Sequence, residues 1–235
     1  PALPAGLSID SSTGRISGTP TVISTLTTYT VYANNTGGSA TTTLDITVND
    51  IIPSSVSYVP DTYTFTKGTS DSTSTPTANG GPVVSWEIHP TLPNGLSIDS
   101  STGQISGTPT ALSSIQTYTV YANNSGGSAT TTIDITVNDV IPSLIAYSSS
   151  AFVETRDSAM TTGIPTVSGG PVVTWSIAPA LPTGLNIDSS TGEISGTPTV
   201  NSPLTTYTVT ATNSGGSATT TIDITVNDII PSSVT

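Results

Sequence analysis

Residues 3–14 read Leu3-Pro4-Ala5-Gly6-Leu7-Ser8-Ile9-Asp10-Ser11-Ser12-Thr13-Gly14. The same stretch returns with few changes at residues 92–103 and again at 181–192. The period is 92 − 3 = 89 residues and then 181 − 92 = 89 residues, with no insertion or deletion. A constant period indicates modules that fold alike and meet their neighbours alike, as in tandem arrays.

The period divides the 235 residues into a partial repeat at 1–53, complete repeats at 54–142 and 143–231, and the start of a further repeat at 232–235. The partial repeat lacks a counterpart of residues 54–89. About 90 residues is an ordinary size for a small β-sandwich. We expect the chain to be an excerpt from a longer array; the alternative is that strands of another molecule complete the first repeat.

Short strands separated by turn residues account for each repeat. In the third repeat Val173, Trp175 and Ile177 alternate with Val172, Thr174 and Ser176. The equivalent residues of the second repeat, 89 positions earlier, are Val84, Trp86 and Ile88. This period of two predicts a strand with one buried face. Asp188-Ser189-Ser190-Thr191-Gly192 has the chemistry of a tight turn, because Asp can accept bonds from nearby amides and Gly allows positive φ.

The end of each repeat predicts a long hairpin. In the third repeat the inward residues begin at Tyr207 on one strand and Ile222 on the other, and Asn213-Ser214-Gly215-Gly216 forms the turn between them. Threonines occupy the alternate positions, which suits the exposed face of a strand. No segment has helical periodicity. The aromatic residues that we assign to the core are Trp86, Trp175, Tyr29, Tyr118 and Tyr207.

The charge balance limits the partners. With 15 acidic and 3 basic residues the formal net charge is −12, so nucleic acid and anionic membranes would be repelled. No apolar run reaches the length of a membrane span. We therefore expect the partners to be adjacent repeats or neighbouring copies, with no nucleic acid bound and no membrane contact by this segment. The chain has no Cys, so no disulfide can brace a repeat.

Catalytic chemistry is not indicated. The one histidine, His89, is replaced by Ala178 in the next repeat. Nine of the 15 acidic residues occupy three positions of the repeat, each of them acidic in all three repeats. Such copies fit a structural role better than a unique active site. Lys67 is the one lysine and its equivalent is Arg156, which excludes an isopeptide cross-link common to the repeats. We predict no enzymatic activity and name no catalytic residue.

The repeated motif resembles a known family. Residues 181–199 read Leu-Pro-Thr-Gly-Leu-Asn-Ile-Asp-Ser-Ser-Thr-Gly-Glu-Ile-Ser-Gly-Thr-Pro-Thr, followed by Tyr-Thr-Val at 207–209 and Asn-Ser-Gly-Gly-Ser-Ala-Thr-Thr-Thr at 213–221. This pattern is similar to the He-PIG immunoglobulin-like repeats of prokaryotic surface proteins, which are related to the cadherin-like group. The resemblance implies an all-β fold of tandem immunoglobulin-like β-sandwiches and an extracellular, cell-surface location in adhesins, stalks or appendages.

The resemblance also raises the question of calcium between repeats, as in cadherin-type joints. Hard oxygen ligands gathered at a domain joint would suit Ca²⁺. Against this, Gly107-Thr108-Pro109-Thr110 carries no carboxylate where cadherins place an acidic segment. Turn-forming Asn and Asp that close a strand are the alternative, and both readings stay open. The candidate ligands are Asp45, Asn49, Asp50, Asp134, Asn138, Asp139, Asp223, Asn227 and Asp228.

Two further features concern the surface. Asn34 and Asn123 begin glycosylation acceptor patterns at equivalent hairpin turns, and the third repeat loses the pattern. The complete repeats agree closely from Gly80 and Gly169 onward but differ across 59–78 and 148–167. Either this segment is a tolerant edge that has drifted, or it faces a neighbouring chain.

Together these features predict a structural section of an extracellular stalk, fibre or filament built from serial immunoglobulin-like modules. Short linkers that contain proline leave little slack between the repeats. The alternative is an adhesin or binding module for a glycan or protein, with calcium-stiffened joints. Because the spacing between repeats never changes, no repeat carries the loop insertion expected of a binding tip.

Overall fold

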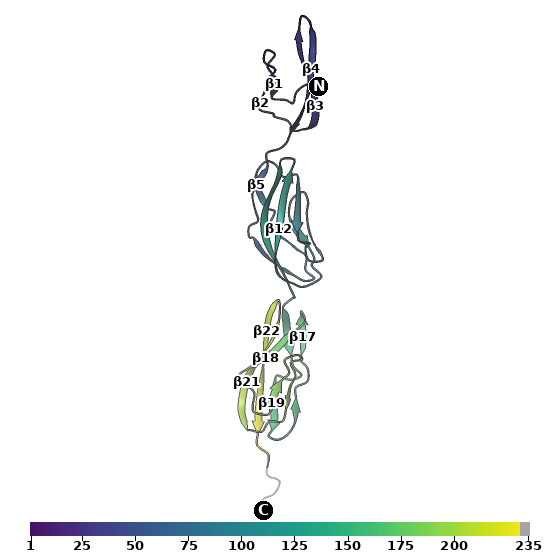
Figure 1. The fold of residues 1–235 in the computed structure, drawn as a ribbon. Helices are drawn as coiled ribbons and strands as arrows, with labels where there is room; N and C mark the ends of the chain where they lie inside the picture. The colour runs from purple at the N-terminus through teal and green to yellow at the C-terminus, as the bar shows by residue number, and fades with distance from the viewer. Residues whose placement is uncertain (231–235) are drawn as a thin grey trace, which may run out of the picture.

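The computed structural model describes residues 1–230, and these contain strands, turns and no helix. Accordingly, no helix in this part of the chain could cross a membrane. The further repeat predicted at 232–235 lies outside the described residues. Three bodies follow one another along an elongated molecule, with the partial repeat at one end and the third repeat at the other (Figure 1).

The first body is the partial repeat, which consists of two antiparallel pairs, β1 with β2 and β3 with β4. Its strands are β1 (Leu7–Ile9), β2 (Ile16–Gly18), β3 (Ser24–Asn35) and β4 (Gly38–Val48).

The second body is a complete β-sandwich. One sheet has the order β6-β13-β12-β9, and it is faced by the sheet β10-β11-β7 and the pair β5-β8. β6 runs parallel to β13, whereas the other pairs are antiparallel. Its strands are β5 (Pro53–Ser57), β6 (Thr62–Thr66), β7 (Asp71–Ser72), β8 (Thr77–Gly80), β9 (Ser85–His89), β10 (Leu96–Ile98), β11 (Ile105–Gly107), β12 (Ser113–Asn124) and β13 (Gly127–Asn138).

The third body repeats this topology with the sheet β15-β22-β21-β18, the sheet β16-β20-β19 and the pair β14-β17. β15 is parallel to β22, as β6 is to β13. Its strands are β14 (Pro142–Ala146), β15 (Ala151–Thr155), β16 (Met160–Thr161), β17 (Thr166–Gly169), β18 (Thr174–Ala178), β19 (Leu185–Ile187), β20 (Ile194–Gly196), β21 (Ser202–Asn213) and β22 (Gly216–Asn227).

A separate core fills each complete sandwich. Trp86 on β9 and Trp175 on β18 are 5% and 6% exposed, and each packs with strands of both sheets. The tyrosines that begin the inward rows of the last hairpins, Tyr118 and Tyr207, are buried in the same cores, and Tyr29 is buried at the equivalent place in the partial repeat. Because each core is local to one repeat, the repeats can be treated as separate folding units connected by their linkers.

One inward assignment is wrong. Val173 and Val84 were expected to face the core with the tryptophans, but they are 63% and 68% exposed. The strands begin one residue later, at Thr174 and Ser85, and the preceding valines, Val172 and Val83, pack on the core instead. The alternation of period two therefore does not extend into the segment before the strand.

The predicted Asp-Ser-Ser-Thr-Gly turn forms around its aspartate. In the second repeat the Asp99 carboxylate accepts bonds from the Ser101 hydroxyl (2.6 Å), the Ser101 N–H (2.7 Å) and the Thr102 N–H (2.9 Å). These bonds, with the Ser101 hydroxyl first, lower the pKa of Asp99 to about 2. The equivalent Asp10 and Asp188 have lowered pKa values for the same kind of reason.

The low pKa gives the turn a defined pH dependence. An unfolded Asp titrates near pH ~3.9, so this turn contributes its stability above that pH and loses it as the pH falls from ~4 through 2. NMR titration of the folded chain should give an Asp99 carboxyl midpoint near 2. In Asp99→Asn the melting temperature of the second repeat should depend less steeply on pH in that window. A midpoint near 4 in the folded chain would contradict the hydrogen-bonded turn.

Candidate functional site: the joints between repeats

The hairpin turn between β12 and β13 is closed by a side chain. Asn124 Oδ1 accepts hydrogen bonds from the backbone N–H groups of Gly126 (2.8 Å) and Gly127 (3.2 Å). An Asn side chain that bonds amides two and three residues ahead copies a backbone turn and fixes its shape. The turn therefore holds the other half of the Asn124 amide, its Nδ2 group, in one position.

That amide nitrogen holds the linker from the preceding repeat. Asn124 Nδ2 donates to the carbonyl oxygens of Ile51 (2.7 Å) and Pro82 (3.1 Å). Next to it, the Asp50 N–H donates to Ser125 Oγ at 3.0 Å, and Ser125 Oγ lies 3.3 Å from the Asp50 carboxylate. The turn of one repeat thus binds the chain that leaves the repeat before it, at positions 73 and 75 residues apart in sequence.

Glycines allow the linker to approach this closely. A Cβ on Gly126 would lie 2.1 Å from the Asp50 carbonyl oxygen, and one on Gly81 would lie 1.8 Å from the Ile51 carbonyl oxygen. Both distances are far shorter than real contacts between nonbonded carbon and oxygen atoms. The Gly81 N–H also donates to the Ile52 carbonyl at 3.3 Å. The linker consequently has backbone contacts on two sides and little freedom to turn.

The second joint has the same geometry. Asn213 Nδ2 donates to Val140 O at 2.7 Å and Pro171 O at 3.0 Å, and the Asp139 N–H donates to Ser214 Oγ at 2.9 Å. Each of these lengths is within 0.1 Å of its counterpart in the first joint. Asp139 and Asn213 are 5% and 7% exposed, so the contact is largely closed to solvent.

The partial repeat carries the same turn without such a contact in the described chain. Asn35 Oδ1 accepts from the Gly37 N–H at 2.8 Å, as in the other two turns. A Cβ on Gly37 would have only Asn35 Oδ1 nearby, at 3.2 Å. The turn is therefore an intrinsic property of the Asn-x-Gly-Gly sequence, and binding the linker is an additional use of it.

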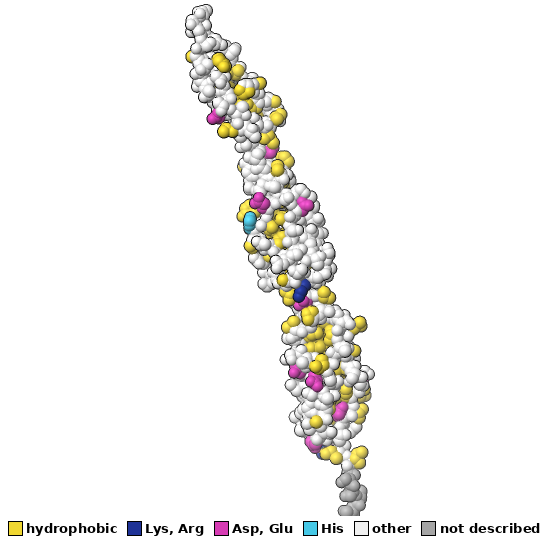
Figure 2. Space-filling model, turned by 90° about the vertical axis from the view of Figure 1, so that its right-hand side faces the viewer, with side chains coloured by type: hydrophobic (Ala, Val, Ile, Leu, Met, Phe, Trp, Pro, Cys, Tyr) yellow, Lys and Arg dark blue, Asp and Glu magenta, His cyan; other side chains and the backbone are white. Residues whose placement is uncertain are grey.

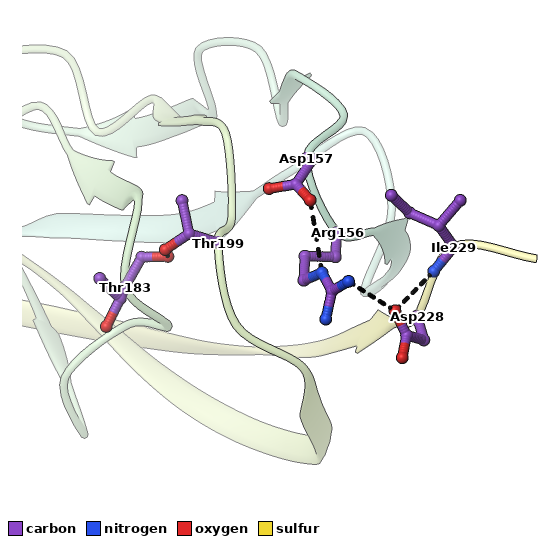
Figure 3. Close-up of polar contacts among 6 residues, drawn as sticks. All are labelled: Arg156, Asp157, Thr183, Thr199, Asp228 and Ile229. Atoms are coloured by element: carbon purple, nitrogen blue, oxygen red, sulfur yellow. Dashed lines mark hydrogen bonds and ion pairs between the residues drawn. The ribbon is translucent and has the colours of Figure 1, made fainter.

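The far end of the third repeat is closed by a pair of ion pairs (Figure 3). Arg156, just after β15, places Nη2 at 3.0 Å from Asp228 Oδ1 and Nε at 3.3 Å from Asp157 Oδ2. The Ile229 N–H, then the Asn201 side chain, and to a lesser extent Arg156 lower the pKa of Asp228. Because the carboxylates of both pairs are exposed to solvent, the ion pairs add little to stability. Asp228 is the equivalent of the joint residues Asp50 and Asp139.

The candidate calcium ligands are dispersed. The strand aspartates bond threonine hydroxyls directly across the hairpin, and among residues 1–230 no group of three or more His, Asp or Glu could hold a metal ion. Each joint has one carboxylate, Asp50 or Asp139, and it faces a serine. Asn49 is exposed. The backbone carbonyls of Asn138 and Asn227 accept hydrogen bonds from the N–H groups of Lys67 and Arg156. Calcium binding stays a prediction, without a gathered ligand set. The strand pairs are Thr28–Asp45 (2.5 Å), Thr117–Asp134 (2.6 Å) and Thr206–Asp223 (2.6 Å).

The candidate glycosylation residues lie beside hairpin turns, and only Asn123 is next to a joint. Asn34 and Asn123 accept hydrogen bonds from Ser39 and Ser128 at 2.5 Å. Ser125, which completes the acceptor pattern of Asn123, is engaged with the linker. Glycosylation stays a prediction. Sequence reasoning identified the Asn-x-Gly-Gly segments as hairpin turns and missed their contact with the linker; the recurrence of Asp-x-Ile-Pro 89 residues apart is the signal that could have revealed it.

The observations define a tandem array of immunoglobulin-like β-sandwiches with repeated joints. A protein-family model described as "Putative Ig domain" (He_PIG) matches residues 1–49, 51–138 and 142–227. The chain belongs to this family.

Relatives and solved structures are more distant. A "Serine-rich adhesin for platelets" of Staphylococcus aureus is 34% identical over 132 residues, which are 55% of this chain and 6% of the relative. The same protein of strain MRSA252 is 35% identical over 131 residues, 55% of this chain and 10% of the relative. The chain thus spans a tenth or less of the length of these two relatives. The I-band fragment I67–I69 of titin is 16% identical, with 86% of this chain and 75% of that chain covered and a TM-score of 0.48.

The joint glycines allow a direct test. In Gly215→Ala the new Cβ would collide with the Asp139 carbonyl oxygen, so the linker should leave the turn while both sandwiches stay folded. Loss of about 1–3 kcal/mol of joint contacts should raise cleavage of residues 139–141 by a nonspecific protease about tenfold or more.

Gly37→Ala is the matched control, because it changes the same turn position where no linker is bound. It should leave the cleavage rate at residues 139–141 unchanged, and circular dichroism should show both variants folded. Equal resistance of Gly215→Ala and the unaltered chain, mapped by mass spectrometry, would show that the close approach does not hold the linker.

Proposed function

We propose that this chain is a section of an extracellular, cell-surface stalk or fibre, in which the repeats act as spacers of fixed length and direction. The observation that carries the proposal is the agreement of the two joints within 0.1 Å in their two linker bonds. The bond from the same asparagine to Pro82 or Pro171 of its own repeat agrees equally well. A joint that repeats its geometry gives the same rotation and rise at each step, which produces a regular rod.

The surface supports the same role. Figure 2 shows a narrow body with few charged side chains, mostly acidic, scattered along its length. Threonines on the outward positions of the long hairpins add polar surface without adding charge. Such a surface keeps near-identical β-modules from pairing edge to edge at high local concentration. The proposed work is mechanical and spatial, with neighbouring repeats or copies as partners and no catalysis.

An adhesin role is the second candidate. It is favoured by the names of the staphylococcal relatives, which are adhesins for platelets. In that role one repeat would bind a glycan or protein, and the remaining repeats would extend it from the cell. Binding of the 235-residue chain to a glycan or protein array would favour this candidate over a spacer.

Small-angle X-ray scattering of the chain tests the spacer role. We expect a rod-like profile whose maximum dimension is the same in calcium and in EGTA, because the linkers are held by hydrogen bonds to Asn and Ser side chains. A shorter, broader distribution in both buffers would contradict a fixed spacer. A rod in calcium that collapses in EGTA would assign the stiffness to calcium at the joints.

A further inference from the structure

Tension along the array would follow a defined path through each complete repeat. The chain enters the second repeat through its linker and β5 at one end, and leaves from the end of β13 at the other end (Figure 1). The third repeat is entered through β14 and left from β22 in the same way. A pull on the two ends of the molecule therefore acts on the first strands and the last strand of each sandwich, in opposite directions.

These strands are paired in parallel. β6 aligns with β13 from Thr62↔Asp134 to Thr66↔Asn138, and β15 aligns with β22 from Ala151↔Asp223 to Thr155↔Asn227. Flanking backbone bonds lengthen both ladders: the Asp134 N–H donates to Asp61 O (2.9 Å) and the Lys67 N–H donates to Asn138 O (2.8 Å). The third repeat has the same pair of flanking bonds, both 2.8 Å, from Asp223 to Ser150 and from Arg156 to Asn227.

The direction of the load decides how such a ladder fails. Ladder hydrogen bonds run across the strands, so strands pulled from opposite ends must slide and break several bonds together. Strands pulled apart at one shared end open one bond at a time. We infer that each complete repeat is a tension-resistant module whose mechanical strength resides in the parallel pairs β6–β13 and β15–β22. The inference rests on the proposed stalk function for its biological use, and on strand geometry alone for its mechanics.

The two pairs differ in how well they are sheltered from water. In the second repeat Phe65 is opposite Val137 in the ladder, and both side chains are 1% exposed. In the third repeat Glu154 takes the place of Phe65 opposite Val226 and is only half-buried. Water that reaches a strained hydrogen bond replaces its partner and lowers the cost of breaking it. The β15–β22 pair should therefore yield first, although Arg156 and Asp228 add an ion pair at its end.

This assigns a use to the segment in which the complete repeats differ. Phe65 and Glu154 belong to the unlike stretches 59–78 and 148–167, whereas their partner strands β13 and β22 are identical in sequence. Variation there changes one side of the parallel pair and leaves the Asn and Gly contacts of the joints as they are. It also replaces the exposed Asp71 of the second repeat by the core residue Met160 in the third. A set of repeats could in this way have the same shape and graded resistance to tension.

Single-molecule force spectroscopy of the 235-residue chain tests the inference. Pulled from its two ends, the chain should give one unfolding event for each complete repeat, each releasing about 300 Å of contour length. Because the chain has no Cys, a Thr62→Cys, Thr132→Cys variant can instead be pulled through these two positions, which lie near the same end of the β6–β13 pair. That direction peels the pair open, and the unfolding force of the second repeat should fall by about a factor of two or more.

Equal forces in the two directions would overturn the inference. As a control, the Cys variant without load should melt at the same temperature as the parent chain. As a second measurement, Glu154→Phe should raise the force of the weaker event toward that of the second repeat; no increase would contradict the role given to the sheltered ladder. A chain that bends freely in solution would defeat the stalk proposal yet leave these forces unchanged, so the two failures can be told apart.

Discussion

The amide of one asparagine, Asn124 or Asn213, connects each repeat to the one before it. Its oxygen closes a hairpin turn within its own repeat, and its nitrogen donates to the linker that arrives from the preceding repeat. The side chain can do both because an amide has an acceptor oxygen and two donor hydrogens that point in different directions within one rigid plane. Without the turn the nitrogen would have no fixed direction, and without the linker contact the turn would be only the end of a hairpin.

The same constraint explains why the two linkers have the same length. The linker must lie within reach of the Asn and against two glycines of the next repeat, and an inserted residue would move its carbonyl groups out of register with all three. The joint therefore fixes the length of the linker, which is one part of the 89-residue period. In the partial repeat the turn keeps its fold, which separates local turn chemistry from linker binding.

Much of the fold follows from local patterns in the sequence. The alternation around Trp86 and Trp175, the aspartate-centred turns and the long hairpins predict the strands and the cores, because each depends on residues close together in the chain. The linker contact could not be predicted in this way, since it joins residues 73 to 75 positions apart and reads locally as an ordinary turn. The parallel partner of β6 was missed for a related reason: a five-residue strand carries no signal for which distant strand it will join. Val84 and Val173 show a different error: they were assigned to the core by extending the alternation one residue before the strand begins, and they are exposed.

Both joints should hold their two repeats in the same relation. Pulsed electron–electron double resonance on pairs of spin labels measures the distances that define this relation. Thr43, Thr132 and Thr221 are exposed equivalents in the three repeats, and the absence of native Cys permits labelling at positions 43 and 132, or 132 and 221, alone. Two narrow distance distributions with the same mean are predicted. Broad distributions, or two clearly different means, would contradict the account.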